Sequence, residues 1–260
     1  MSSTLPRDPA APDARPRKPR FDVRVQRVRP LTPRMVRVTF GGEALGAFAW
    51  NGPAAHIKLI FPTAERDRPI MRTYTPRRYD AVARELDVDF VLHDDGPASN
   101  WARQAAPGQA LVIAGPGRSY SVDQQADWFL LAADDTAIPA VGTILEQLPP
   151  EARVRVLLEV VDEAEQGALD AVPGRVDIEW LHRGPDARNA GRPLEAAVRH
   201  VQLPAGSGRV YVACEADAMR RIRRHLLHER HLARDSVVTR GYWRLGETDH
   251  PDRDYGEDVG

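Results

Sequence analysis

The sequence has 260 residues, of which 42% are hydrophobic and 28% are charged, values that are typical of a soluble globular protein with one large domain or two ordinary ones. Its formal net charge of -1 at pH 7 gives no electrostatic reason to expect a nucleic acid or an anionic membrane surface as a partner. Cys214 is the only cysteine, which excludes an internal disulfide and a four-thiolate iron–sulfur cluster.

The N-terminal stretch does not resemble a signal peptide. Residues 1–20 are rich in proline, arginine and alanine and have no periodic apolar face, so we expect a disordered tail. This stretch lacks the apolar core of a signal peptide. No apolar run in the sequence approaches the ~20 residues that a membrane-spanning helix needs. We therefore expect a cytoplasmic protein that does not insert into a membrane.

The first half of the chain mostly alternates apolar and polar residues with a period of two. Proline, glycine or charged turn residues separate these stretches, which predicts the short strands of an antiparallel barrel or sandwich. One helix, which begins at Pro97 and carries Ser99 near its start, interrupts the pattern. The alternating stretches are residues 21–28, 34–40, 55–61, 84–93 and 109–115.

In the second half, apolar runs typical of buried strands alternate with helical patterns. This order predicts a parallel sheet with right-handed crossovers. We expect a β-barrel domain over residues 21–123, an α/β domain over 124–246, and an acidic, solvated tail over 247–260. The strand candidates are 128–133, 153–161, 175–182, 208–214 and one within 236–246, and the helix candidates are 137–148, 193–201 and 216–230.

The segment Arg-Thr-Tyr-Thr, which starts at Arg72, combines groups that suit a flavin. In an extended strand Arg72 and Tyr74 share one face, and Thr73 and Thr75 share the other. The segment thus offers a cation for a pyrophosphate, an aromatic wall for the isoalloxazine ring and a hydroxyl for its N5 atom. Pro76 is expected to end regular strand pairing. The alternative is an ordinary edge strand with an exposed arginine.

A turn of the phosphate-binding type follows, where the stretch HDDGPASNWA closes a strand and opens a helix. Gly96 permits close approach of the backbone, and the first helical amides together with the Ser99 hydroxyl can receive a phosphate. The alternative is a plain N-cap, in which Ser99 satisfies its own helix. The strand with arginine and tyrosine and this turn would bracket one dinucleotide.

The order of these features resembles the ferredoxin reductase superfamily and, more narrowly, the siderophore-interacting protein family, which are FAD-dependent ferric-siderophore reductases. The resemblance covers nearly all of residues 21–246, and the combination of RTYTPR, GPASNWA and GYWRLG is more specific than any one of these motifs. The stretches that carry it are AHIKLIFP, RTYTPRRYD, ELDVDFVLH, GPASNWARQAAPGQALVIAGPGRS, AADDTAIPA and TRGYWRLG.

The resemblance implies an antiparallel β-barrel that binds FAD, followed by an α/β domain that binds NADPH or NADH. Tyr74 would stack on the flavin ring and Thr75 would hydrogen-bond near N5, so these two are the expected catalytic residues. Arg72 would hold the pyrophosphate with the start of the helix, and His93 either contacts FAD or bonds its own loop. The other residues implied in cofactor binding are Thr73, Val91, Pro97, Ala98, Ser99, Thr136, Arg183 and Trp243.

The nicotinamide half lacks the Gly-x-Gly-x-x-Gly fingerprint. The resemblance places Thr136 near the pyrophosphate of the donor, a role that is compatible with a helix cap by Asp135 or Thr136. Arg183 follows a predicted strand and would pair with a 2′-phosphate, which would favour NADPH over NADH, and the alternative is a solvated arginine. The basic helix over 216–230 predicts a solvated face, with contact from Arg220 or Arg221 to cofactor phosphates as the alternative.

Three positions depart from the cofactor pattern or extend it towards a substrate. Cys214 stands where the family usually has glycine, and we expect a small buried thiol there. Ferric siderophores are commonly anionic, so the resemblance implies that Lys58 and Arg244 contact the substrate. The alternatives are a snorkelling strand lysine and a surface arginine. The siderophore itself ligates the iron, and we expect no metal site in the protein.

These inferences predict a monomeric enzyme that passes electrons from NADPH or NADH through FAD to its substrate, a ferric siderophore, with ferredoxin as an alternative donor. One competing hypothesis is a general NAD(P)H-dependent flavin or ferric reductase whose acceptor is not a siderophore. The other is a siderophore-binding protein without redox chemistry.

Overall fold

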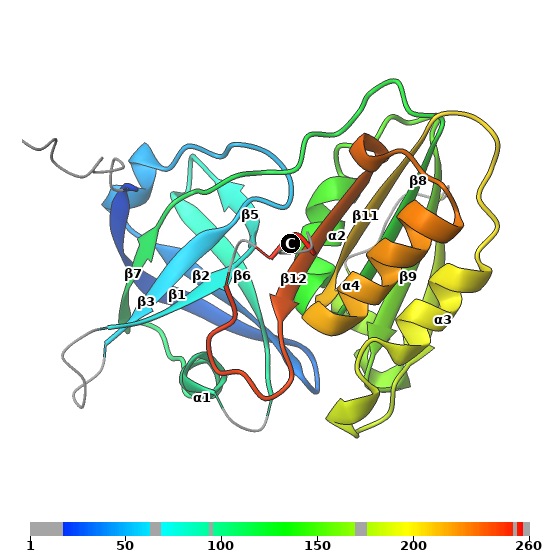
Figure 1. Ribbon diagram of the computed structural model, residues 1–260. Coiled ribbons are helices and arrows are strands. Elements are labelled where there is room, and N and C mark those ends of the chain that lie inside the picture. The colour runs from blue at the N-terminus through cyan, green and yellow to red at the C-terminus, as the bar shows by residue number, and fades with distance from the viewer. Residues whose placement is uncertain (1–17, 63–68, 94–95, 170–175, 252–253, 257–260) are drawn as a thin grey trace, which may run out of the picture.

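The computed structural model describes residues 18–62, 69–93, 96–169, 176–251 and 254–256 (Figure 1). Two separate sheets, one antiparallel and one parallel, lie side by side in the order that the sequence predicts. Most of the expected N-terminal tail falls outside the described residues.

The first sheet is antiparallel throughout and has seven strands. They are β1 (Arg20–Thr32), β2 (Met35–Gly41), β3 (Ile57–Phe61), β4 (Ile70–Tyr74), β5 (Pro76–Asp80), β6 (Glu85–Val91) and β7 (Ala110–Ala114). Their spatial order is β4-β3-β7-β1-β2-β6-β5. The apolar residues that alternate along these strands fill one interior, with Phe40, Leu86 and Phe90 fully buried, as the period-two pattern predicts.

The two edge strands of this sheet are consecutive in the chain. β4 ends at Tyr74 and β5 begins at Pro76, so Thr75 alone links one edge to the other and the sheet must curl into a half-barrel. The expectation that Pro76 ends strand pairing is wrong, because Pro76 pairs with Val88 of β6 as the first residue of β5. A proline is tolerated at this position because β5 is an edge strand, so the N–H that proline lacks is not needed for a hydrogen bond within the sheet.

The second sheet is parallel, with the strand order β10-β9-β8-β11-β12. Its members are β8 (Trp128–Asp134), β9 (Arg153–Val160), β10 (Val176–His182), β11 (Gly208–Glu215) and β12 (Val237–Trp243). The α-helices are α1 (Pro97–Arg103) in the barrel domain and α2 (Ile138–Leu145), α3 (Arg192–His200) and α4 (Ala216–Arg224) in this one. Shorter helical turns are η1 (Glu43–Ala47), η2 (Asp135–Ala137), η3 (Glu163–Ala168), η4 (Ala187–Asn189), η5 (His225–Glu229) and η6 (Arg234–Ser236).

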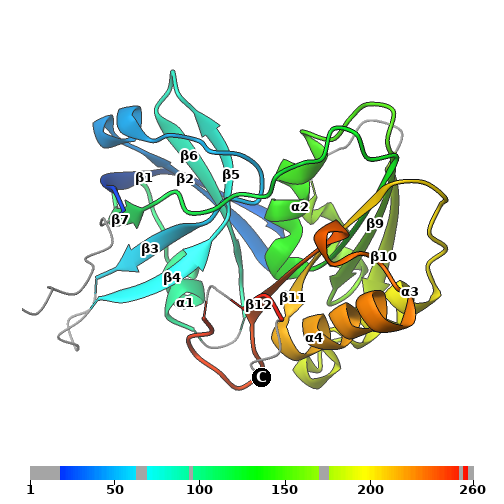
Figure 2. The same cartoon turned by 45° about the horizontal axis from the view of Figure 1, so that its top comes forward.

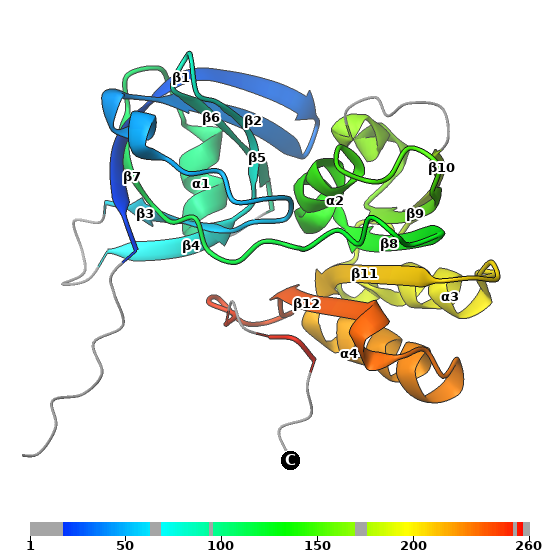
Figure 3. The same cartoon turned by 90° about the horizontal axis from the view of Figure 1, so that it is seen from above.

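Helices cover both faces of the parallel sheet, as Figure 3 shows. Phe129 and Leu131 of β8 point to the face that α2 covers, whereas Leu130 points to the face that α3 and α4 cover. β8 is therefore apolar on both sides, which is why its sequence is a continuous apolar run. The helix predicted over 216–230 is present as α4 followed without a break by a π-helical turn, η5, which ends at Glu229.

Polar contacts join the two domains where α2 faces the barrel (Figure 3). Arg77 of β5 pairs with Glu146 at 2.7 Å, and the amide of Ala54 donates to the Thr143 hydroxyl at 2.9 Å. Elsewhere along the interface, the Thr32 hydroxyl donates to the buried carboxylate of Glu165. These contacts hold the carboxyl ends of the parallel strands in a defined position beside the barrel.

The prediction of a solvated tail after residue 246 does not hold for the part of this segment that the structure describes. The amide of Gly241 donates to the Asp254 carbonyl at 2.9 Å, and Arg220 pairs with the Asp254 carboxylate at 2.7 Å. The segment runs back towards the barrel, where Asp249 lies 3.4 Å from Arg72 (Figure 2). Acidic composition suggested solvation, but basic partners on α4 and β4 give these carboxylates specific contacts.

Candidate functional site

The strand that carries the flavin motif lies at an edge of the barrel. Lys58 of β3 pairs with Thr73 of β4, and Leu59 pairs with Arg72. Since cross-strand partners share a face, Arg72 and Tyr74 lie on the inner face with the buried Leu59, and Thr73 lies on the outer face with Lys58. The predicted alternation along this segment is therefore present.

Tyr74 and helix α1 meet through a shared aromatic neighbour. The Tyr74 ring packs on Phe90 of β6 with centroids 4.5 Å apart, and Phe90 packs on Trp101 of α1 at 5.7 Å. The tyrosine-bearing strand and the serine-bearing helix thus converge at one side of the barrel, as expected of two segments that bracket one ligand. Burial raises the pKa of the Tyr74 phenol well above its usual value, so the ring stays neutral.

Ser99 does not present its hydroxyl to a ligand as expected. It is 1% exposed, and its Oγ accepts the His93 N–H at 3.0 Å and donates to the His93 carbonyl at 2.9 Å. The N-cap of α1 is Gly96, which the His93 ring covers so closely that a Cβ there would lie 2.4 Å from Cε1. The predicted phosphate contacts therefore remain with the first amides of α1, after Pro97, at Ala98 and Ser99. Ser99 instead fixes the loop that leads into the helix.

The two barrel cations predicted to bind ligands already have acceptors nearby. Lys58 Nζ donates to the Thr73 hydroxyl at 2.6 Å. Arg72 Nη1 donates to the Met71 carbonyl at 2.8 Å and lies 3.4 Å from Asp249 of the C-terminal segment. Arg72 thus lies on the same face of β4 as Tyr74, where a pyrophosphate is expected. In this structure its ionic partner is the exposed carboxylate of Asp249.

A buried carboxylate organises the carboxyl ends of β8, β11 and β12. Asp134 Oδ1 accepts from the Thr136 amide at 3.0 Å and from its hydroxyl at 2.5 Å. Asp134 Oδ2 accepts from the Glu215 amide at 2.9 Å and from Trp243 Nε1 at 2.8 Å. Burial, and secondarily the adjacent Asp135, raise the pKa of Asp134 to about 7. Asp134 is therefore the N-cap of this turn, in place of the cap by Asp135 or Thr136 that the sequence suggested, and Thr136 donates to it.

Arg183 is turned into the protein. Its side chain is 12% exposed and pairs with Asp135 at 2.5 Å, and its Nη1 is buried without a hydrogen-bond partner among the described residues. The geometry argues against the 2′-phosphate contact expected from the sequence, because the Asp135 carboxylate already takes the guanidinium.

The aromatic–basic end of β12 connects the two sheets. The Tyr242 side chain lies beside that of Thr75, the single residue between β4 and β5, and its hydroxyl lies 3.2 Å from the Tyr211 hydroxyl. Arg244, which follows β12, pairs with Asp217 and Glu247, each at 3.2 Å.

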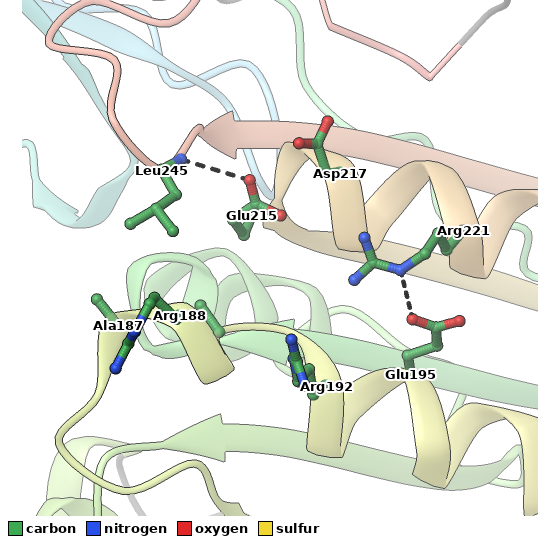
Figure 4. A pocket seen from close by; sticks show the side chains of 9 residues that line it. Ala187, Arg188, Arg192, Glu195, Glu215, Asp217, Arg221 and Leu245 are labelled. Carbon is green, nitrogen blue, oxygen red and sulfur yellow. Dashed lines mark hydrogen bonds and ion pairs between the residues drawn. The ribbon is translucent and has the colours of Figure 1, made fainter.

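A pocket of about 430 Å³ lies at the carboxyl side of the parallel sheet, between α4 and the start of α3 (Figure 4). Arg188, Arg192 and Arg221 line it, together with Glu195, Glu215, Asp217 and Leu245. Sequence reasoning named Arg221 only as an alternative and missed the other two arginines, as well as Asp134 and Tyr242. Their roles depend on contacts between strands and helices that are distant in sequence.

The comparisons with known proteins agree with this geometry. The sequence matches the siderophore-interacting FAD-binding domain over residues 24–67 and 63–120, and the siderophore-interacting protein family over residues 126–246. The ferric vibriobactin reductase ViuB of Vibrio cholerae is 34% identical over 236 residues, which cover 83% of this chain and 86% of that protein. The chain belongs to the siderophore-interacting protein family.

Other members of this family span nearly the whole chain. An NADPH-dependent ferric-chelate reductase of Escherichia coli is 32% identical and covers 88% of this chain and 96% of its own length. The structure of a siderophore utilization protein from T. fusca superimposes with a TM-score of 0.81 at 39% identity, covering 90% of this chain and 96% of that one.

For the fold alone, a ferredoxin NADP⁺ reductase from Neisseria gonorrhoeae matches with a TM-score of 0.64 at 16% identity, covering 86% of this chain and 99% of that one. The predicted two-domain, ferredoxin reductase-like fold is confirmed. Within the described ranges, every helix falls short of the length and apolar character that a bilayer crossing requires.

The residues of the barrel fit FAD, the cofactor of the matched domain. An aromatic ring (Tyr74), a guanidinium (Arg72) and the amides at the start of α1 gather at the side of the barrel that faces β12. The ring suits the isoalloxazine of the cofactor, and the guanidinium and the amides both suit its pyrophosphate.

Proposed function

We propose that this member of the siderophore-interacting protein family is a cytoplasmic, FAD-dependent reductase that takes electrons from NADPH and delivers them to ferric iron held by a siderophore. The observation that carries the proposal is the proximity of the Thr75 and Tyr242 side chains. Thr75 links the two edge strands at the predicted flavin site. Tyr242 belongs to the parallel sheet, whose carboxyl ends suit a nicotinamide dinucleotide. A flavin and a nicotinamide bound to these two elements would be neighbours.

FAD, when bound, accepts a hydride from a nicotinamide and releases electrons singly, which matches the one-electron reduction of ferric iron. The chain would supply the surroundings of this chemistry. Tyr74, backed by Phe90, would form a flat neutral wall, and the Thr75 hydroxyl would donate to the ring. When FAD binds, Arg72 would leave the exposed Asp249 carboxylate and pair with the pyrophosphate of the cofactor instead.

The substrate would approach from the basic edge of the barrel. Ferric siderophores are commonly anionic complexes, so Lys58 on the outer face of β3 and Arg244 after β12 would attract them from two sides. The protein need supply no iron ligand, because the siderophore holds ferric iron with hard oxygens and holds ferrous iron weakly. Reduction would therefore release the metal.

An assay with a ferrous-specific chelator tests the proposal. Purified holoenzyme, NADPH and a ferric siderophore should yield the coloured ferrous complex at the same rate with and without added free FAD. A rate that depends on free flavin would instead indicate a general flavin reductase. No ferrous product, with FAD bound and NADPH present, would indicate a siderophore-binding protein without redox chemistry.

A paired variant tests the assigned flavin site. Tyr74→Ala combined with Ser99→Ala removes the aromatic wall and loosens the loop before α1, so the purified protein should lack FAD. Tyr74→Phe keeps the ring and should retain the cofactor. Absorbance at the flavin bands, relative to protein concentration, measures occupancy. Full occupancy in the double variant would show that the site lies elsewhere.

A further inference from the structure

A tyrosine in the interior of the parallel sheet carries a hydroxyl that packing alone does not require. Tyr211 of β11 is 2% exposed and lies in the apolar cluster between the sheet and α2. A phenylalanine would fill nearly the same volume without burying a polar group. A buried hydroxyl costs free energy unless it is hydrogen-bonded, so a tyrosine at this position needs a partner.

The partner is a second tyrosine at the end of β12. The Tyr211 hydroxyl lies 3.2 Å from the Tyr242 hydroxyl, and within the described part of the chain this is the only hydrogen bond that the Tyr211 side chain makes. Burial raises the pKa of both phenols above the usual value, so each keeps its proton at neutral pH. The pair therefore has two protons, of which only one can lie between the two oxygens.

The direction of this hydrogen bond follows from the burial of Tyr211. If Tyr242 donated, the proton of Tyr211 would point into the apolar cluster, where the described residues offer it no acceptor. An unsatisfied buried donor is costly. Tyr242 is only half-buried, so its own proton has more freedom. Tyr211 is therefore the donor, and the proton of Tyr242 turns away from it.

An irregularity in β12 determines where Tyr242 lies. The strand pairs with β11 in regular register up to Gly241, but the next residue to pair with β11 is Trp243. Tyr242 is thus the extra residue of a β-bulge, a feature that redirects side chains and is common beside functional sites. At this bulge the Tyr242 side chain lies beside that of Thr75, between β4 and β5 of the barrel.

Thr75 is the third hydroxyl of this series and is 6% exposed. A proton that Tyr242 directs at the Thr75 oxygen leaves the Thr75 proton for an acceptor on its other side. Under the proposed function that acceptor is N5 of the flavin ring. Oxidised flavin accepts a hydrogen bond at N5, whereas reduced flavin carries a proton there and donates it. Hydrogen bonds to the ring are among the means by which a protein tunes a flavin.

We propose that Tyr211 and Tyr242 are positioning residues that direct the Thr75 hydroxyl towards the flavin and thereby lower the reduction potential of bound FAD. The inference rests on the proposed function, because it specifies how the same site is tuned. When each hydroxyl donates to the next, from Tyr211 to Tyr242 to Thr75, an acceptor beyond Thr75 satisfies the whole series. A donor beyond Thr75 reverses the series and leaves the buried Tyr211 proton without an acceptor. The series thus disfavours the reduced ring, which makes that ring a stronger reductant for ferric iron.

The reduction potential of the bound FAD tests the proposal without any nicotinamide or iron. It is measured anaerobically, with slow reduction by xanthine and xanthine oxidase in the presence of a reference dye. Tyr211→Phe keeps the ring and removes the hydroxyl, so the potential should rise. The equilibrium constant for reduction should increase about tenfold, the usual effect of one unsatisfied buried donor, which is about 30 mV for a two-electron couple.

A double variant tests whether Tyr211 acts through Tyr242. Tyr242→Phe should raise the potential at least as much as Tyr211→Phe does. The combination of both changes should give the shift of Tyr242→Phe alone, because Tyr211 has no other route to the flavin side. A merely structural role of the pair would lower the thermal stability of these variants and leave the potential where it is in wild type.

Tyr120→Phe is the matched control. Tyr120 is 7% exposed and its ring packs edge-on against that of Tyr211, with centroids 5.3 Å apart. This change removes a phenol hydroxyl from the same cluster without altering the hydrogen-bonded pair, so the potential should match that of wild type. FAD occupancy should be unchanged in every variant, since all of them keep their aromatic rings.

The proposal would be overturned by a potential in Tyr211→Phe that equals or lies below that of wild type. An equal shift in Tyr120→Phe, or additive shifts in the double variant, would overturn it as well. Failure of the proposed function is a separate result, seen as absence of ferrous product from wild-type holoenzyme with NADPH and a ferric siderophore. Wild-type protein that does not bind FAD would overturn both.

Discussion

The indole N–H of Trp243 donates to Asp134 at 2.8 Å, although β11 lies between their strands in the sheet. Asp134 also accepts the amide of Glu215 on that intervening strand. One buried carboxylate thus ties the carboxyl ends of three strands together and fixes the aromatic residue that ends β12. The position of Trp243 beside the donor site is therefore set by a residue 109 positions earlier.

Trp243→Phe removes this hydrogen bond and keeps an aromatic ring. We expect a loss of about 1 kcal/mol in the free energy of unfolding, the usual contribution of one such bond. We also expect slower reduction of bound FAD by NADPH in stopped-flow measurements, because the ring is no longer held, whereas FAD occupancy should not change. A variant that matches wild type in both rate and stability would show that the contact has no role.

The pKa of Asp134, raised to about 7 by burial and by Asp135, predicts a pH dependence of stability. The unfolded chain releases this proton near pH 4, whereas the folded protein holds it until about pH 7. The folded state thus binds more protons across this window, so the group's contribution to stability falls as pH rises from about 4 to 7. Asp134→Asn should remove this component from the denaturation midpoints measured across that range. An unchanged slope in the variant would assign the dependence to other groups.

A buried ion pair in the barrel gives a prediction about stability. Arg37 of β2 and Asp89 of β6 form two hydrogen bonds of 2.6 and 2.8 Å, and the Asp89 side chain is 1% exposed. Asp89→Ala removes the paired carboxylate from a buried guanidinium and should cost about 3 kcal/mol or more in urea denaturation. Arg37→Met combined with Asp89→Leu should recover most of that loss. A loss in the double variant as large as in the single one would contradict this interpretation.

Much of the fold could be predicted from the sequence because both sheets have clear apolar patterns. The alternation in β1 and β2 and the continuous apolar run of β8 each follow from which faces are buried. Pro76 pairs with Val88, and a proline can pair in this way because β5 is an edge strand. The sequence does not show which strands lie at the edge, so this pairing was not predicted. The helical extent of α4 and η5 was predicted, but the change to π-type hydrogen bonding at His225 was not, because η5 keeps a helical pattern in its sequence.

The candidate site was predictable in its local motifs but not in its long-range contacts. The Arg-Thr-Tyr-Thr segment and the helix at Pro97 could be identified because each motif lies within a few residues. The internal pairing of Arg183 was not visible in the sequence, because its partner, Asp135, lies 48 positions away in the turn η2. Likewise, the pocket between Arg192 and Arg221 depends on the close approach of α3 and α4 at Gly191.

The single cysteine gives a simple test of the sheet that carries the donor site. Cys214 is 0% exposed, and burial raises the pKa of its thiol well above the usual value. The thiolate is the reactive form, so native protein should not react with an alkylating reagent at neutral pH. Mass spectrometry should find the label only after denaturation. Rapid labelling of native enzyme would contradict the buried position.

An anaerobic absorbance titration tests the central claim most directly, because it follows the cofactor between donor and acceptor in the same cuvette. On addition of NADPH to the purified holoenzyme, the flavin bands should bleach. On subsequent addition of a ferric siderophore, they should recover as ferrous iron is formed. Flavin bands that fail to bleach with either NADPH or NADH, or that stay bleached after the ferric complex is added, would contradict the account.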